Sequence, residues 1–360
     1  MQQKQEREES RSPRFITFGE IMLRLTPPNN ELVRTATSFD AHYGGSEANI
    51  ALALANLGVD STFFTIVPDN AVGKSAVRML RANNVDCSPV VFSSAEETPS
   101  QRLGVYYLEM GYSVRPSKVT YDRKHSAITE YDLSKVDLTA LLIDYDWLHL
   151  SGITPALAPT CADFILRMLK KAKELGLTVS FDGNFRSTLW TWEEARDFCT
   201  KCLPFVDVLM GIEPYHLWRD EDDHSKGDVK DGLPMQPGYD EQDAVFKAFA
   251  KRYPNIKCIS RHVRYAHSGN ENSLKAYLWL DGRTWESKLF HFQILDRVGS
   301  GDAFASGLIY AIMNGYAPED IANFATASCA IKHTIHGDGN IIDSAETIRQ
   351  LMDMSFDIKR

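Results

Sequence analysis

A glycine-rich segment late in the chain combines an anion-binding backbone with a carboxylate. It runs Asp296-Arg-Val-Gly-Ser-Gly-Asp302, follows an extended apolar run and opens an apolar helix. Gly299 and Gly301 let the backbone approach a ligand closely, and the N–H groups of a first helical turn point outward at the positive end of the helix dipole. The segment therefore predicts an anion site. A carboxylate there suits the removal of a proton from an attacking hydroxyl, which predicts Asp302 as a general base.

Asp302 also has a plainer interpretation, because aspartate is a favoured capping residue at a helix start. A second motif bears on this choice. Gly44-Gly45-Ser46-Glu47-Ala48-Asn49 again places glycines at the start of a helical pattern. Two such motifs in one chain favour the chemical interpretation of Asp302.

The elements that must position these motifs alternate between strands and helices. Short apolar, β-branched runs predict buried strands at residues 15–25, 61–67, 147–151, 178–181, 206–210 and 258–260. Helical spacing of apolar residues predicts helices at 50–57 and 161–175, each ending at a glycine. This alternation predicts an α/β fold with a parallel sheet covered by helices on both faces.

Some regions break the alternation. Residues 39–43 and 102–122 are strand-like without helices between them, with a turn expected at Met110-Gly111, and they predict a small β lid outside the main sheet. A hairpin is expected at 276–286 around Asp281-Gly282.

A polar stretch at residues 219–243 predicts a surface insertion. Its acidic start resembles a calcium loop, but Ser225 stands at the sixth position from Asp220, where a calcium loop needs glycine. We therefore do not predict a metal site there.

Composition narrows the class of protein. The 360 residues are 44% apolar and 24% charged, which excludes disorder of the whole chain and a membrane-spanning segment. A net charge of −9 opposes nonspecific binding to nucleic acid or acidic lipid, so a small-molecule partner is expected. Residues 1–14 predict a mobile tail with no export signal. Six scattered cysteines, including a Cys199-x-x-Cys202 pair, predict ordinary thiols in a reducing cytoplasm.

Together the two glycine motifs resemble the signatures of the ribokinase-like (PfkB-type) sugar kinases, and the resemblance covers roughly residues 15–351. Within that family, Asp182-Gly-Asn184-Phe-Arg186, Tyr121-Asp-Arg123, Arg297 and the ending Lys332-His-Thr-Ile-His-Gly-Asp338 resemble the 2-keto-3-deoxygluconate kinases. The resemblance implies a three-layer α/β/α, Rossmann-like kinase domain over 15–354, with lid strands within 22–45 and 100–124.

The same resemblance implies a reaction and its site. The γ-phosphoryl group of ATP would pass to the primary hydroxyl of a sugar or sugar acid, with Asp302 as the base and the amides of Gly299, Ser300 and Gly301 as the anion hole. The substrate residues it implies are Gly44, Gly45, Asn49, Tyr106, Tyr121, Arg123, Asn184, Arg186, Asp302 and Asp338. The ATP residues it implies are Ser260, Arg264, Gly269, Gly299, Gly301 and Asn323.

Magnesium is expected with ATP, but its ligands are not assigned by the sequence. Many relatives carry Asn and, three residues later, Glu after the strand at 206–210, whereas this chain has Gly211-Ile-Glu213-Pro. Glu213 is only a candidate ligand.

Two arginines bear on the substrate. Arg186 follows the strand at 178–181, and Arg123 belongs to the lid; a guanidinium offers paired donors that fit a carboxylate, which favours a sugar acid. Alternatively, each arginine pairs with a structural aspartate such as Asp182 or Asp122. The competing functions are a kinase for a neutral sugar such as fructose or ribose, and a catalytically silent sugar-acid sensor.

The lid also predicts self-association. A small isolated sheet leaves an apolar face and open edges, so we expect a homo-oligomer that pairs through the lid.

Overall fold

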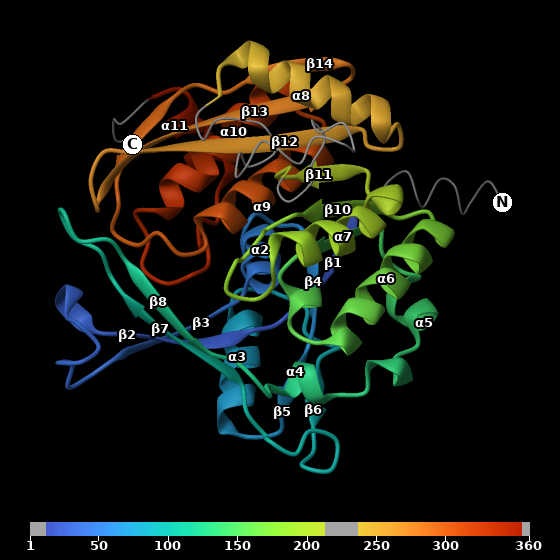
Figure 1. The fold of residues 1–360 in the computed structure, drawn as a ribbon, viewed down its shortest axis with the longest axis vertical. Helices are drawn as coiled ribbons and strands as arrows, with labels where there is room; N and C mark the ends of the chain where they lie inside the picture. The colour runs from blue at the N-terminus through green and yellow to red at the C-terminus, as the bar shows by residue number, and fades with distance from the viewer. Residues whose placement is uncertain (1–11, 213–236, 355–360) are drawn as a thin grey trace.

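A large mixed sheet forms the centre of the molecule (Figure 1). The structure is a computed structural model that describes residues 12–212 and 237–354. Nine strands of the described chain form this sheet, in the order β14-β13-β12-β11-β10-β9-β1-β4, with β15 paired to β13. Neighbouring strands from β4 to β12 are parallel, and β13, β14 and β15 join antiparallel. The bounds are β1 (Arg14–Phe18), β4 (Asp60–Phe64), β9 (Trp147–Ser151), β10 (Thr178–Asp182), β11 (Val208–Met210), β12 (Cys258–Ala266), β13 (Glu271–Leu280), β14 (Arg283–Glu286) and β15 (Phe290–Gln293).

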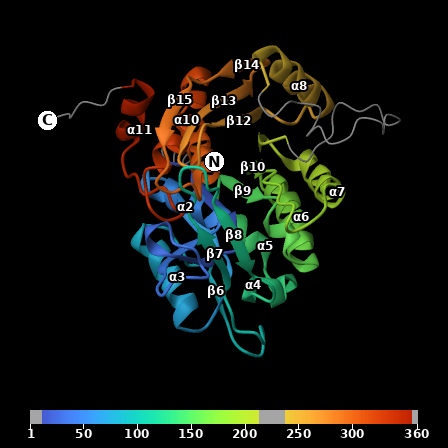
Figure 2. The ribbon, with the colours of Figure 1, turned by 60° about the vertical axis from the view of Figure 1, so that its left-hand side comes forward.

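Helices cover both faces because side chains alternate along the buried strands: Phe15 packs into one core cluster and Ile16 into the other. One face carries α2 (Ser46–Asn56), α3 (Ala71–Ala82), α9 (Ser300–Met313), α10 (Pro318–Lys332) and α11 (Ala345–Met352). The other carries α4 (Ala127–Glu130), α5 (Leu138–Leu142), α6 (Pro159–Glu174), α7 (Trp192–Cys202) and α8 (Tyr239–Arg252). Figure 2 shows the two helical layers on either side of the strands. The predicted three-layer α/β/α architecture is confirmed.

A smaller sheet projects from the main body as a lid (Figure 1). Its strands are β2 (Met22–Thr26), β3 (Asp40–Gly44), β7 (Gly104–Glu109) and β8 (Lys118–Asp122), in the order β3-β2-β7-β8. A further pair, β5 (Ile66–Pro68) and β6 (Val91–Ser93), forms a two-stranded sheet. The lid confirms the small β-sheet expected from the sequence.

Several boundaries differ from the sequence predictions. The run at 15–25 is two strands in different sheets, because the chain leaves the main sheet after Phe18 and enters the lid at Met22. The first strand includes Arg14, whose side chain pairs with Asp60; residues 1–11 of the expected tail lie outside the described residues. The lid hairpin reverses beyond Met110-Gly111, since Tyr112 bridges to Arg115.

The last residues of the predicted insertion at 219–243 are helical rather than loop. Residues 219–236 lie outside the described residues, and α8 begins at Tyr239 with Glu241 accepting a hydrogen bond from the N–H of Gly238. Asp240 and Glu241, which precede the apolar residues of α8, therefore belong to the first turn of this helix. The Cys199 and Cys202 thiols are buried in α7, and the described cysteines form no disulfide.

A buried ion network ties the lid to the main body. The guanidinium of Arg24 in β2 donates to Asp296 at 2.6 Å and to Asp338 at 2.8 Å, and its side chain is only 2% exposed. Asp296 precedes the glycine-rich loop and accepts hydrogen bonds from the N–H groups of Val298 and Gly337. One lid cation thus bridges two buried carboxylates, of which Asp296 holds that loop and the chain around Gly337.

We expect Arg24→Met to lower the free energy of unfolding by about 3–5 kcal/mol, because removal of one partner leaves buried charges without compensation. Denaturant unfolding measures the effect. The matched control is Arg102→Met in the same lid, whose pair with Asp122 is solvent-exposed and contributes about 1 kcal/mol or less. Equal losses for the two variants would contradict this account of the network.

Candidate active site

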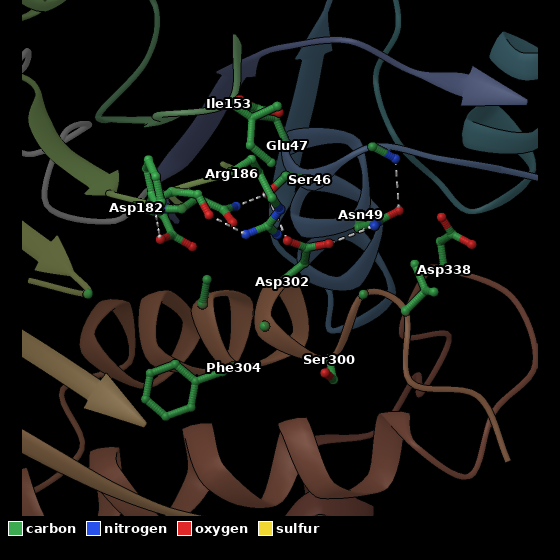
Figure 3. Close-up of a pocket in the computed structure, with 18 of the residues that line it drawn as sticks. Ser46, Glu47, Asn49, Ile153, Asp182, Arg186, Ser300, Asp302, Phe304 and Asp338 are labelled. Carbon is green, nitrogen blue, oxygen red and sulfur yellow. Dashed lines mark hydrogen bonds between the residues drawn. The ribbon is translucent and has the colours of Figure 1, made fainter. Parts of the chain in front are cut away.

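A cavity of about 660 Å³ lies at the carboxyl ends of the parallel strands, between the main sheet and the lid. This edge is where ligands of open α/β sheets bind. Figure 3 shows the lining side chains converging from α2, from the loop after β10 and from the start of α9. Segments far apart in the sequence therefore meet at one site.

The glycine-rich loop forms one wall of the cavity. Gly299 has a φ of 77°, in the left-handed region, and a Cβ there would lie 1.8 Å from the carbonyl oxygen of Asp338. Only glycine satisfies both constraints. Because α9 begins at Ser300, the first-turn amides of Ser300 and Gly301 stand at the positive end of the helix dipole beside the cavity.

Asp302 lies in the first turn of α9 and is held by the first turn of α2. Its two carboxylate oxygens accept hydrogen bonds from the Ser46 hydroxyl and the Asn49 side-chain amide, each at 2.7 Å. Burial raises the pKa of Asp302 above that of an ordinary aspartate, although these two hydrogen bonds oppose the rise. A positioned carboxylate with a raised pKa is suited to accept a proton.

Two further carboxylates lie close by (Figure 3). Burial, reinforced by the negative charge of Asp302, raises the pKa of Asp182 to about 7. Burial also raises the pKa of Glu47, which accepts hydrogen bonds from Ser151 and Thr154. Ser46 and Glu47 belong to the first glycine motif, but the motif assigned neither residue a role. A sequence motif does not reveal which of its side chains point into the cavity.

Asn184 connects the loop after β10 to the base. Its amide nitrogen donates to the Ser46 hydroxyl at 3.0 Å, and its backbone N–H donates to Asp182 at 2.9 Å. Its φ of 38° is unusual for a residue other than glycine, and the contact with Asp182 fixes it there.

The lid supplies aromatic and charged groups. The rings of Tyr106 and Tyr121 lie 5.7 Å apart, and the Tyr106 hydroxyl donates to Asp338, whose other oxygen accepts from Arg24. Burial and the charge of Asp338 raise the pKa of Tyr106 well above its usual value. Asp338 is thus placed at the cavity with both of its oxygens already engaged.

The two arginines predicted at the substrate differ. Arg123 lines the cavity, but its guanidinium forms a buried pair with Glu20, a partner that the sequence analysis did not anticipate. Arg186 is solvent-exposed at the cavity and lies beside Asp182 and Asp302 (Figure 3). Its positive charge opposes the rise in the pKa of both carboxyls that burial causes. Its guanidinium donates a hydrogen bond to the backbone carbonyl of Phe185. Arg186 therefore offers the more available guanidinium.

The residues predicted for ATP separate into two groups. Ser260 and Arg264 in β12 line the cavity with the glycine-rich loop. Gly269 does not: it lies in the β12–β13 turn, where its N–H donates to the carbonyl of Ser113 in the lid hairpin. Asn323 does not either, because it is buried in α10 and its side chain accepts a hydrogen bond from the N–H of Lys288. The hydrogen bonds of these two residues are to other parts of the chain, and neither lines the cavity.

Two other predicted residues need comment. Gly44 is not among the lining residues; it packs against Asp338, where a Cβ would lie 2.1 Å from a carboxylate oxygen. Glu213, the candidate magnesium ligand, lies outside the described residues. Within the described ranges no group of three His, Cys, Asp or Glu side chains is placed to hold a metal ion.

The comparisons with known proteins agree with this geometry. The sequence profile of the pfkB family of carbohydrate kinases matches residues 13–214 and 280–345, and the chain belongs to that family. A 2-dehydro-3-deoxygalactonokinase from Haloferax volcanii is 30% identical over 94% of this chain and 96% of its own length. The crystal structure of a 2-dehydro-3-deoxygluconokinase from Thermotoga maritima superposes with a TM-score of 0.86 at 35% identity, covering 95% of this chain and 99% of that one.

A third relative extends the range of substrates. A 5-dehydro-2-deoxygluconokinase from Clostridium perfringens is 26% identical over 96% of this chain and 94% of its own length. The protein is thus a carbohydrate kinase whose similar proteins include several that are named for sugar acids.

Asp302→Asn should lower kcat by about a hundredfold or more, because a positioned base contributes 10² to 10⁴ and the amide cannot accept the proton. Sugar binding should change little, since Asn preserves the size of the side chain. Steady-state kinetics and calorimetry check both parts. Near-full turnover in a folded variant would remove Asp302 from the mechanism.

Asp182→Asn should remove an inflection near pH 7 from the kcat/KM profile. Burial and the charge of Asp302 raise the pKa of Asp182 to about 7, so this carboxyl loses its proton near neutrality and then adds a second negative charge beside the base. Asparagine stays neutral at every pH and retains an oxygen for the N–H of Asn184. The profile is measured from about pH 5 to 9, with Asp197→Asn on the exposed side of α7 as control. An inflection near pH 7 that persists in Asp182→Asn contradicts this assignment.

Proposed function

We propose that the protein catalyses ATP-dependent phosphorylation of the primary hydroxyl of 2-keto-3-deoxygluconate, producing the 6-phosphate, in the catabolism of sugar acids. The observation that carries the proposal is the exposed guanidinium of Arg186 beside the base Asp302. A neutral sugar has no group that matches its paired donors, whereas a carboxylate does.

The activities for which the relatives are named support this class of substrate. The Haloferax, Thermotoga and Clostridium proteins are named for different compounds, but each compound is a deoxy-keto sugar acid. A carboxylate, a ketone and a terminal hydroxyl are common to all three. The site of this chain suits the same combination.

Asp302 would act as the base at the acceptor hydroxyl. Each carboxylate oxygen has two lone-pair positions, so Ser46 and Asn49 can keep their hydrogen bonds while the substrate O–H donates to a remaining one. The hydroxyl oxygen bonds to the γ-phosphorus, the bond from that phosphorus to the β-phosphate oxygen breaks, ADP leaves, and Asp302 holds the proton. Gly299, Ser300 and Gly301 direct backbone amides toward the negative charge of the transferred group.

Other groups would hold the two ends of the substrate. Arg186 would bind the carboxylate, and Tyr121 would cover the sugar from the lid. Arg123 would act indirectly, because its pair with Glu20 anchors the end of β8. Asn49 would serve both the base and a sugar hydroxyl, and Asp338 would align Tyr106.

ATP would lie along Ser260 and Arg264 next to the glycine-rich loop. Magnesium would accompany it, carried mainly by phosphate oxygens and water, as is usual for this ion in kinases. Its charge would then offset that of the phosphates. We place the reaction in the cytoplasm, where ATP and reduced thiols coexist. None of the described helices is long and apolar enough to cross a membrane.

The epimer at C4 is a second candidate substrate. The Haloferax relative is named for the galactonate compound and the Thermotoga protein for the gluconate compound. Arg186 would bind the carboxylate and Asp302 would act at the primary hydroxyl. Both epimers carry these two groups, so either could bind in this way. Side-by-side kinetics on both epimers distinguishes a selective enzyme from one that accepts both.

The lid would also pair with a second copy of the chain. Strands β3 and β8 are the edges of the lid sheet, and Phe39, beside the start of β3 and outside the cavity lining, is an exposed large apolar side chain. Light scattering at micromolar concentration should give the mass of a dimer, and Phe39→Asp should shift it toward one chain. A strictly monomeric native mass contradicts the pairing.

Arg186→Ala should lower kcat/KM for 2-keto-3-deoxygluconate by about tenfold to a hundredfold or more. Charge-assisted bonds contribute roughly 1.5–3 kcal/mol, and about 1.4 kcal/mol corresponds to a factor of ten. Weak activity on fructose should hardly change, because fructose has no carboxylate.

Arg196→Ala, which changes an exposed arginine on α7, is the matched control and should leave both activities unchanged. If the wild-type enzyme prefers fructose, or if Arg186→Ala reduces both activities equally, the enzyme is a kinase for a neutral sugar. If it binds the acid without turnover, it is a sensor.

A further inference from the structure

Two arginines line the cavity at the glycine-rich segment. Arg264 comes from β12, and Arg297 lies in the loop between β15 and α9, two residues before Gly299. The Arg264 guanidinium reaches the Ser300 hydroxyl at 3.4 Å, which places it at the first turn of α9. The two side chains thus stand next to the predicted anion hole.

Neither guanidinium has an acidic partner within ion-pair distance in the part of the chain that the structure describes. Arg297 has a neutral contact instead: with the Asn272 amide oriented to satisfy both of its ends, the Asn272 oxygen accepts from Arg297 Nη2 at 3.2 Å. The Nε atoms of both arginines are buried without a hydrogen-bond partner. Burial and the positive charge of Arg264 lower the pKa of Arg297.

The neighbouring carboxylate does not balance this pair. Asp296 precedes Arg297 but is fully buried and points to Arg24 and to the N–H groups of Val298 and Gly337. Two partly buried like charges raise the free energy of the protein unless an anion lies between them. The geometry therefore favours a negatively charged ligand here.

The position of the pair along the loop identifies which part of the ligand it meets. The transferred phosphoryl group must lie between the base Asp302 and the rest of the nucleotide. Ser300, which Arg264 contacts, is two residues from Asp302 in the same helical turn. The pair is thus next to the place that the reacting phosphate would take, on the nucleotide side of Asp302.

We propose that Arg264 and Arg297 bind the oxygens of the terminal phosphoryl group of ATP and neutralise its charge during transfer. Guanidinium groups suit this task, since their paired donors match phosphate oxygens and their charge persists at all physiological pH values. The proposal deepens the proposed kinase function and rests on it. Arg297 thereby has a role in the reaction, and Arg264 contacts the terminal phosphate of ATP rather than the nucleotide in general.

The test compares ATP with ADP. In magnesium-containing buffer without sugar, calorimetry on Arg264→Gln and Arg297→Gln should show ATP binding weakened about tenfold to a hundredfold. ADP binding should change less than about threefold, because ADP lacks the terminal group. The lysine variants at both positions should recover part of the ATP affinity and of kcat. Arg196→Gln is the surface control.

Equal weakening for ATP and ADP would overturn the proposal, since the pair would then hold the inner phosphates. Unchanged ATP affinity in both glutamine variants would also overturn it. Where a glutamine variant does not fold, the lysine variant decides by the same comparison. Nucleotide binding is measured without sugar, so the result does not depend on which sugar is the substrate. Failure of the wild-type protein to bind ATP would instead reject the kinase function itself.

Discussion

The buried network around Arg24 is the interaction on which the arrangement of the site depends. A single guanidinium from the lid compensates Asp296 and Asp338, and these carboxylates in turn hold the loop of Val298 and the side chain of Tyr106. Burial of three charged groups is costly unless all are paired. Since the pairing is complete only when lid, loop and C-terminal segment meet, the network favours one mutual placement of all three.

That placement brings groups of both charges to the cavity. Asp182 and Asp302 come from the loop after β10 and the first turn of α9, and Arg264 and Arg297 come from β12 and from the residues just before Gly299. An acceptor hydroxyl needs a base, and a phosphoryl donor needs positive charge. The helix dipole of α9 adds to the positive charge. The net charge of −9 therefore describes the whole chain but not the residues that would meet the phosphates.

Prediction from sequence succeeded where chemistry is local. The glycines before α9, the carboxylate at Asp302 and the strand–helix alternation all follow from short-range rules, and the α/β fold and kinase family are confirmed. It failed where one run serves two sheets, as at 15–25. It also did not reveal the hydrogen bonds of Gly269 with Ser113 and of Asn323 with Lys288, because such contacts leave no trace in the spacing of residues.

The sequence by itself determined the local backbone features of the site. These are the positions that need glycine, the start of the helix after each glycine motif, and the carboxylate that follows the anion-binding loop. These depend on residues within one turn of each other, so pattern alone reports them. Only the tertiary structure decided how the charged side chains are partnered. Arg123 pairs with Glu20, 103 positions away, while Arg24 pairs with Asp338 across 314 positions. Coulombic pairing acts through space rather than along the chain, so folding alone distinguishes an arginine already paired from one, such as Arg186, that faces the cavity.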